Sequence, residues 1–210
     1  MNSAGDGFAW PFQDPRWFGK TVVQGLIAII PIVGWIALAG WTMLTIDSYR
    51  AGRRELPPAG FHLARGVESF LVFVTYAIVF SIPGGIVTNL AATVNSRALA
   101  SLGNLIDLAL GLFLAFLASA VILLTYRRGL SGGFDFAGIR QLVTANTSNS
   151  VLAALVIIVA NVIAGMGAIL CLVGLLFTVP YALAVIAGAV TWYERVVTGP
   201  TPGPPPQATG

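Results

Sequence analysis

The side chains that could perform acid–base chemistry or bind a metal are few and widely spaced in this sequence. His62 is the only histidine, and no cysteine or carboxylate cluster lies near it to complete a metal site. The sequence contains no phosphate-binding loop, zinc-protease or serine-hydrolase motif, and no carboxylates and histidines spaced for proton transfer. We therefore expect no catalytic residue, no cofactor and no metal, and a protein that is not an enzyme.

One carboxylate, Asp107, lies inside an apolar stretch, where an ionised group is costly and usually has a function. This stretch predicts a helix over 105–126, with Asp107 about one turn from its outer end. There the carboxylate could face Arg97 or a water-filled vestibule. The alternative is an interfacial carboxylate that the dipole of the helix stabilises.

A second polar residue, Asn161, lies near the middle of the apolar stretch 151–170. An asparagine at this depth usually forms a hydrogen bond to a neighbouring helix, and we expect that role. The alternative is a transport route lined by Asn161 and Asp107, next to a helix break at Pro83. Asp107 and Asn161 are therefore the candidate polar positions in the membrane.

Two stretches, 53–66 and 129–146, combine arginines with large apolar side chains. This pattern is typical of amphipathic segments that lie on a membrane surface, where each cation contributes about 1 kcal/mol of attraction to anionic lipid. Simple connecting loops are the alternative. The candidate lipid or partner contacts in and beside these stretches are Arg53, Arg54, Arg65, Arg127, Arg128 and Arg140.

The composition indicates a membrane protein. Of the 210 residues, 57% are hydrophobic and 9% are charged, against roughly 25% charged residues in an ordinary soluble domain. The eleven lysines and arginines lie between apolar stretches rather than on one soluble face, so we expect no nucleic-acid partner. The expected partners are membrane lipids and other membrane proteins or a second copy, and no small-molecule substrate can be identified.

The spacing of apolar stretches predicts an all-α, polytopic bundle of about six transmembrane helices arranged as three hairpins. A turn at Pro31 to Gly34 would form the first hairpin, although one long kinked helix is an alternative. Asp14 is expected to cap the first helix. The expected helices are 15–31, 34–51, 67–88, 105–126, 151–170 and 173–195.

Three regions follow from this pattern: an N-terminal arm over 1–13, a membrane domain over 14–196 and a tail over 197–210. The tail is rich in proline and glycine and has no apolar period, so we expect it to be disordered. Since most basic residues lie between the hairpins, the positive-inside tendency places both termini in the cytoplasm of a cell-membrane protein. Five crossings, with the arm outside, are the alternative.

Three of the expected helices end in similar residues: Tyr49-Arg50, Tyr126-Arg127 and Tyr193-Glu194-Arg195. An aromatic ring followed by a cation is typical of a membrane boundary. The similarity suggests an internal triplication, and chance agreement between apolar segments is the alternative.

Further motifs carry a resemblance to a family. They are Trp10-Pro11, Asp14-Pro15-Arg16-Trp17, Tyr49-Arg50-Ala51-Gly52, Leu56-Pro57-Pro58 and a short stretch that ends at Gly66. Over roughly residues 8–195 the chain resembles the prokaryotic multi-pass membrane family catalogued as domain of unknown function 4013. Ala59-Gly60-Phe61 departs from the aromatic residue expected directly after the prolines. The resemblance implies a helical membrane domain and supplies no activity.

Taken together, the residues favour a non-enzymatic scaffold or partner subunit that contacts lipid or other membrane proteins. A small transporter or channel is the alternative, with Asp107 and Asn161 on its route. A membrane enzyme that acts on lipids would need a polar cavity at the interface.

Overall fold

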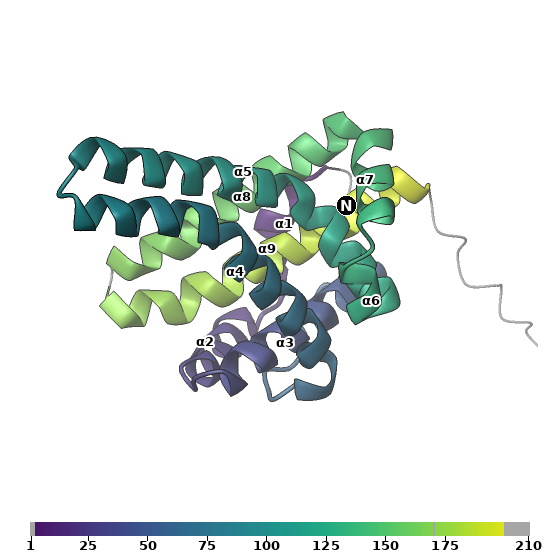
Figure 1. Cartoon of the computed structure of the whole chain (residues 1–210). Coiled ribbons are helices and arrows are strands. Elements are labelled where there is room, and N and C mark those ends of the chain that lie inside the picture. The colour runs from purple at the N-terminus through teal and green to yellow at the C-terminus, as the bar shows by residue number, and fades with distance from the viewer. Residues whose placement is uncertain (1–2, 170, 200–210) are drawn as a thin grey trace, which may run out of the picture.

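The computed structural model describes residues 3–169 and 171–199, which form helices and no strand (Figure 1). The tail predicted to be disordered, 197–210, begins inside the last helix, and its residues 200–210 lie outside the described residues. The elements are α1 (Asp6–Ala9), the 3-10 helix η1 (Trp10–Gln13), α2 (Trp17–Ala28), α3 (Val33–Arg50), α4 (Leu63–Thr93), α5 (Arg97–Arg128), α6 (Leu130–Gly133), α7 (Phe136–Ala145), α8 (Thr147–Ile169) and α9 (Cys171–Thr198).

Four of the described helices are long and apolar enough to cross a membrane: α4, α5, α8 and, from Val173, α9. They form two antiparallel hairpins, α4–α5 and α8–α9, whose tips lie at the same end of the molecule, at the left of Figure 1. The connecting helices α6 and α7 lie at the opposite end. This arrangement is consistent with a multi-pass membrane protein.

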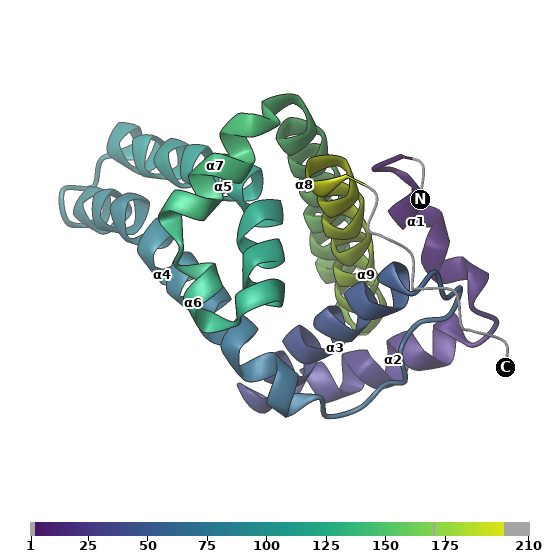
Figure 2. The ribbon, with the colours of Figure 1, turned by 90° about the vertical axis from the view of Figure 1, so that its right-hand side faces the viewer.

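The N-terminal apolar region forms a hairpin, as predicted, with its turn at residues 29–32. However, α2 has only 12 residues, about 18 Å of helix, whereas a hydrocarbon core is about 30 Å thick. Neither α2 nor α3 is among the four candidate spans, so the predicted six crossings are not confirmed. In Figure 2 the two helices lie across α9, and a Cβ on Gly25 of α2 would lie 2.1 Å from the Leu176 carbonyl oxygen of α9.

Helices α4 and α5 are longer than predicted. The residues between the predicted helices 67–88 and 105–126 are mostly helical, because α4 continues to Thr93 and α5 begins at Arg97. Asn95 provides the turn with a positive φ of 53°, which asparagine tolerates better than most residues. Pro83 lies inside α4 and does not end it, although α4 changes direction along its length in Figure 1.

The two stretches predicted to be amphipathic differ from each other. The first, 53–66, has no helix before Leu63, and its Leu56 is buried against the bundle. This first stretch therefore has the form of the alternative, a connecting loop. The second, 129–146, contains α6 and α7, and α7 buries Ile139 and Val143 while it exposes Phe136 and Arg140. Only this second stretch has the predicted amphipathic form.

Asp14 joins the N-terminal part of the chain to the stretch before α4, and it is not the predicted helix cap. Its fully buried carboxylate accepts hydrogen bonds from the Lys20 ammonium at 2.6 Å and from the backbone N–H groups of Arg16 and Leu56 at 2.8 and 2.9 Å. α2 begins three residues later, at Trp17. Tertiary contacts with Leu56 and Lys20 thus replace the local capping role.

The described part of the predicted N-terminal arm, residues 3–13, packs on the bundle. The Trp10 ring stacks on Tyr49 of α3 with ring centroids 3.9 Å apart. The Tyr181 hydroxyl of α9 donates a hydrogen bond to the Phe8 carbonyl at 2.9 Å. α1 and η1 therefore help to connect α3 to α9.

Ser119 of α5 is buried, and its hydroxyl has no hydrogen-bond partner among the described residues. An unpaired buried hydroxyl costs free energy, so Ser119→Ala should leave the free energy of unfolding unchanged or raise it by up to about 1 kcal/mol. Ser150→Ala is the control, because the Ser150 hydroxyl lies 3.0 Å from the Tyr193 hydroxyl. Removal of this hydrogen bond should lower the free energy of unfolding by about 1 kcal/mol. Denaturation in mild detergent measures both. Equal losses for the two variants would contradict the prediction.

Candidate functional site

The ends of three helices meet around one buried carboxylate, Glu194 of α9, which is only 4% exposed. Arg127 of α5 donates two hydrogen bonds to Glu194 Oε1, from Nε at 3.1 Å and Nη2 at 2.8 Å. Arg50 of α3 lies on the other carboxylate oxygen, with Nε 3.2 Å from Oε2. One negative charge therefore holds two arginines from different helices.

The contacts continue from Arg50 to α4. The Arg50 guanidinium lies over the Tyr126 ring, 5.0 Å from its centroid, and the Tyr126 hydroxyl donates a hydrogen bond to Asp47. Asp47 also accepts a hydrogen bond from Arg65 of α4 at 2.6 Å. These six residues, which we call the Glu194 cluster, join α3, α4, α5 and α9. The cluster consists of Asp47, Arg50, Arg65, Tyr126, Arg127 and Glu194.

The sequence signal for this cluster was the repeated tyrosine and arginine at the helix ends. That pattern predicted a membrane boundary, and the structure brings the three helix ends together. It did not predict Glu194 as the centre, because the partners of a carboxylate depend on how the helices pack. The proposed triplication stays a prediction.

The six arginines proposed to contact lipid or a partner have different surroundings. Arg65 and Arg127 belong to the Glu194 cluster, and Arg128 forms an ion pair with Asp135 at 2.8 Å. Arg53 donates a hydrogen bond to the Ser48 hydroxyl at 3.3 Å. Among the described residues, no ion pair involves Arg54 or Arg140, and both are exposed. Those two are the arginines best placed to contact an outside anion.

A small basic pocket lies beside this end of the bundle. It has a volume of about 360 Å³, and three arginines line it together with the rings of Trp10 and Tyr49. The arginines are Arg53, Arg54 and Arg195, and the carboxylate of Asp6 also lies at the pocket. The pocket adds to the positive character around Arg54.

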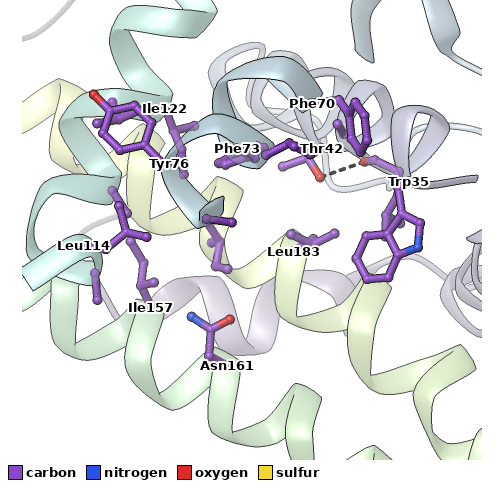
Figure 3. A pocket seen from close by; sticks show the side chains of 18 of the residues that line it. Trp35, Thr42, Phe70, Phe73, Tyr76, Leu114, Ile122, Ile157, Asn161 and Leu183 are labelled. Atoms are coloured by element: carbon purple, nitrogen blue, oxygen red, sulfur yellow. Dashed lines mark hydrogen bonds between the residues drawn. The ribbon is translucent and has the colours of Figure 1, made fainter. Parts of the chain in front are cut away.

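A larger cavity of about 440 Å³ lies between α3, α4, α5, α8 and α9 (Figure 3). Most of its lining is aliphatic or aromatic, as at Leu38, Phe73 and Ile157. Asn161, predicted to hydrogen-bond to another helix, instead lines this cavity, and its side chain has no hydrogen bond among the described residues. In Figure 3 its amide points into the open space.

Asp107 does not line the cavity, so the structure does not bring the two predicted polar positions together. Because α5 begins at Arg97, Asp107 lies ten residues along the helix, about 15 Å from its start, and not one turn as predicted. The carboxylate lies against Gly84 of α4, where a Cβ would come 2.0 Å from Oδ1. No ion pair to Asp107, from Arg97 or any other cation, occurs within residues 3–169 and 171–199.

No group of three or more His, Cys, Asp or Glu side chains that could hold a metal ion occurs in the described part of the chain. His62 instead lies with Nε2 2.9 Å from the Pro58 carbonyl oxygen. The expectation that the protein is not an enzyme stays a prediction.

Comparison with known proteins gives one finding. The model of a family described as "Protein of unknown function (DUF4013)" matches residues 23–173, more than half of the chain. This match confirms the resemblance seen in the sequence, over a shorter range than the predicted 8–195. No curated protein and no solved structure matches the chain. The matched range contains α3, α4, α5 and α8, which supply most of the cavity lining, whereas Glu194 lies beyond it.

Proposed function

The chain belongs to the DUF4013 family, and we propose that it is a non-enzymatic membrane scaffold or partner subunit whose basic end contacts anionic lipid. The family has no assigned role, so the proposal rests on this chain's own residues. Four apolar helices give it the form of a membrane bundle. The observation that carries the proposal is the Glu194 cluster at the end where the basic residues gather.

The cluster supports a structural role because it uses its charges internally. Glu194 neutralises two arginines, and Asp47 neutralises a third, at the ends of four helices. Side chains that bind a substrate need charge or hydrogen-bonding capacity that is not already used, whereas these side chains are paired with one another. Such a cluster fixes the ends of the four helices relative to one another.

Exposed cations at the same end of the bundle as the cluster would supply the contact with the membrane. Arg54 lies at the basic pocket, and Arg140 lies on the exposed face of α7. Each arginine near an anionic membrane surface contributes about 1 kcal/mol. From the positive-inside tendency we propose that this end of the bundle and both termini face the cytoplasm.

We further propose four crossings rather than six. The short α2 and its partner α3 would then pack as a hairpin against the side of α9, where Gly25 meets Leu176, without crossing the membrane. A transport role has less support, because Asp107 lies away from the cavity that Asn161 lines.

The lipid contact is tested with Arg54→Gln together with Arg140→Gln. At about 1 kcal/mol for each lost cation, the affinity of the purified protein for a short-chain anionic phospholipid should fall roughly 20- to 30-fold. Thermophoresis in mild detergent measures the affinity, with a zwitterionic phospholipid of the same chain length for comparison. Arg97→Gln is the matched control, because Arg97 is exposed at the other end of the bundle and should leave the affinity unchanged. Equal losses in the double variant and the control, or no loss in either, would contradict the proposal.

A further inference from the structure

The cavity between the helices is half open to its surroundings, so a ligand can enter it without a rearrangement of the helices. An apolar cavity of about 150 Å³ holds one benzene molecule, so the about 440 Å³ found here corresponds to roughly three such rings, or about 18 carbon atoms. Pockets for lipophilic ligands have volumes in this range.

The cavity is long and has two different ends. Along α5 its lining extends from Gly111 to Ile122, eleven residues or about 16 Å. Gly111 is exposed, as is Asn161 on α8, whereas Ile122 and Ile157 are buried. Ala77 and Trp35 are exposed as well, so the cavity is open along Ala77, Gly111, Asn161 and Trp35, and it is closed at Ile122 and Ile157.

Among the described lining side chains, two polar groups have no hydrogen bond: the Asn161 amide and the Trp35 indole N–H. Two hydroxyls of the lining are already used, since Thr42 donates to the Leu38 carbonyl at 2.9 Å and Tyr76 donates to the Gly133 carbonyl at 2.9 Å. The Asn161 amide points into the cavity with no hydrogen bond. An unpaired amide at this depth costs free energy unless a ligand pairs with it.

From this shape and polarity we propose that the cavity binds one acyl chain, with its carbonyl or carboxyl oxygen accepting a hydrogen bond from the Asn161 amide. An apolar tail of up to about 18 carbons would bend to fit within the roughly 16 Å between Gly111 and Ile122 of α5. The opening lies on α4, α5 and α8, which are candidate membrane spans. The acyl chain would therefore enter from the lipid phase. A free fatty acid and an esterified lipid chain share this chemistry. The site is separate from Arg54, Arg140 and the Glu194 cluster.

Two glycines permit a matched test. A Cβ built on Gly111 or on Gly165 meets nothing within 4 Å, so a larger side chain at either position clashes with no neighbour. Gly111 lines the cavity and Gly165 does not. Replacing an exposed helical glycine by leucine also favours the helix at both positions. Gly111→Leu therefore obstructs the cavity, and Gly165→Leu is its control.

The experiment measures binding of a fluorescent C18 fatty acid to the full chain in mild detergent. We expect Gly111→Leu to weaken binding at least about tenfold, Gly165→Leu to leave it unchanged, and Asn161→Leu to weaken it about 3- to 10-fold through the lost hydrogen bond. Ala77→Phe, at the same opening, is a second obstructing variant. Equal binding by Gly111→Leu, Ala77→Phe and Gly165→Leu would overturn the proposal.

Native mass spectrometry of the purified wild-type protein identifies whether the bound acyl chain belongs to a free fatty acid or to a phospholipid. A retained mass of a free fatty acid or of an intact phospholipid, lost from Gly111→Leu and kept by Gly165→Leu, supports the site and distinguishes the two sources. No difference in retained lipid between the variants would count against it. Because Arg54→Gln with Arg140→Gln should not change fatty-acid binding, failure of the cytoplasmic lipid contact and failure of this site give different results.

Discussion

Glu194→Gln should lower the free energy of unfolding by about 2–4 kcal/mol. The amide keeps the shape of the side chain but removes the charge that holds Arg50 and Arg127, so two cations remain close together. Breaking a fully buried ion pair costs about 3–5 kcal/mol, and we expect somewhat less here because the arginine side chains are 35% and 34% exposed. Denaturation of the purified protein in mild detergent measures the loss.

The control for this prediction is Glu55→Gln. Glu55 forms an ion pair with Arg16 at 3.5 Å, and the two side chains are 60% and 75% exposed. Such a surface pair contributes at most about 1 kcal/mol. If Glu194→Gln were no more destabilising than Glu55→Gln, the cluster would not hold the helix ends together.

Asp14→Asn should also destabilise the protein, by about 3–5 kcal/mol, because it removes the charge facing a largely buried Lys20. The asparagine can still accept one of the backbone hydrogen bonds that now come from Arg16 and Leu56. The stretch before α4 should loosen from the N-terminal segment first. Limited proteolysis between residues 50 and 62, together with detergent denaturation, measures both effects.

The stabilisation of the fold by the Asp14 carboxylate should be lost at low pH. Burial raises the pKa of the Asp14 carboxyl, but hydrogen bonds from Lys20, Arg16 and Leu56 outweigh it and hold the pKa below the usual 3.8. Because the folded pKa is depressed, the carboxylate stabilises the fold above about pH 3.8 and loses this effect as the pH falls through the lower, folded value. The stability gap between wild type and Asp14→Asn should therefore be constant near neutral pH and narrow below 3.8. A gap that narrows between pH 7 and 5 would contradict this explanation.

The features that were predictable from the sequence depend on composition and local turns. The apolar stretches predicted α4, α5, α8 and α9, and Pro31 predicted the turn between α2 and α3. Helices α4 and α5 were predicted too short, because residues such as Asn89 and Asn104 are polar but still compatible with a helix. That error also misplaced Asp107, which lies well inside α5.

Other features depend on tertiary packing and had no local signal. The stretch 53–66 has the apolar and basic residues of a surface helix, but Pro57 and Pro58 remove helix donors and the backbone instead bonds to Asp14 and Gln24. Glu194 becomes the centre of an ion-pair cluster only because three helix ends converge on it. The cavity depends on how five helices diverge, and Asn161 alone marked its position in the sequence.

The central claim is a bundle of four crossings with its basic helix ends in the cytoplasm. Labelling of single cysteines by a membrane-impermeant reagent in intact cells tests it, after Cys171, the single cysteine of the chain, is replaced by alanine. Asn95→Cys, at the α4–α5 tip, should be labelled from outside. Ser131→Cys, in α6, should be labelled only after the cells are opened, and Pro31→Cys, in the α2–α3 turn, should not be labelled from outside. Labelling of Pro31→Cys from outside would restore six crossings, and labelling of Ser131→Cys in intact cells would reverse the proposed orientation.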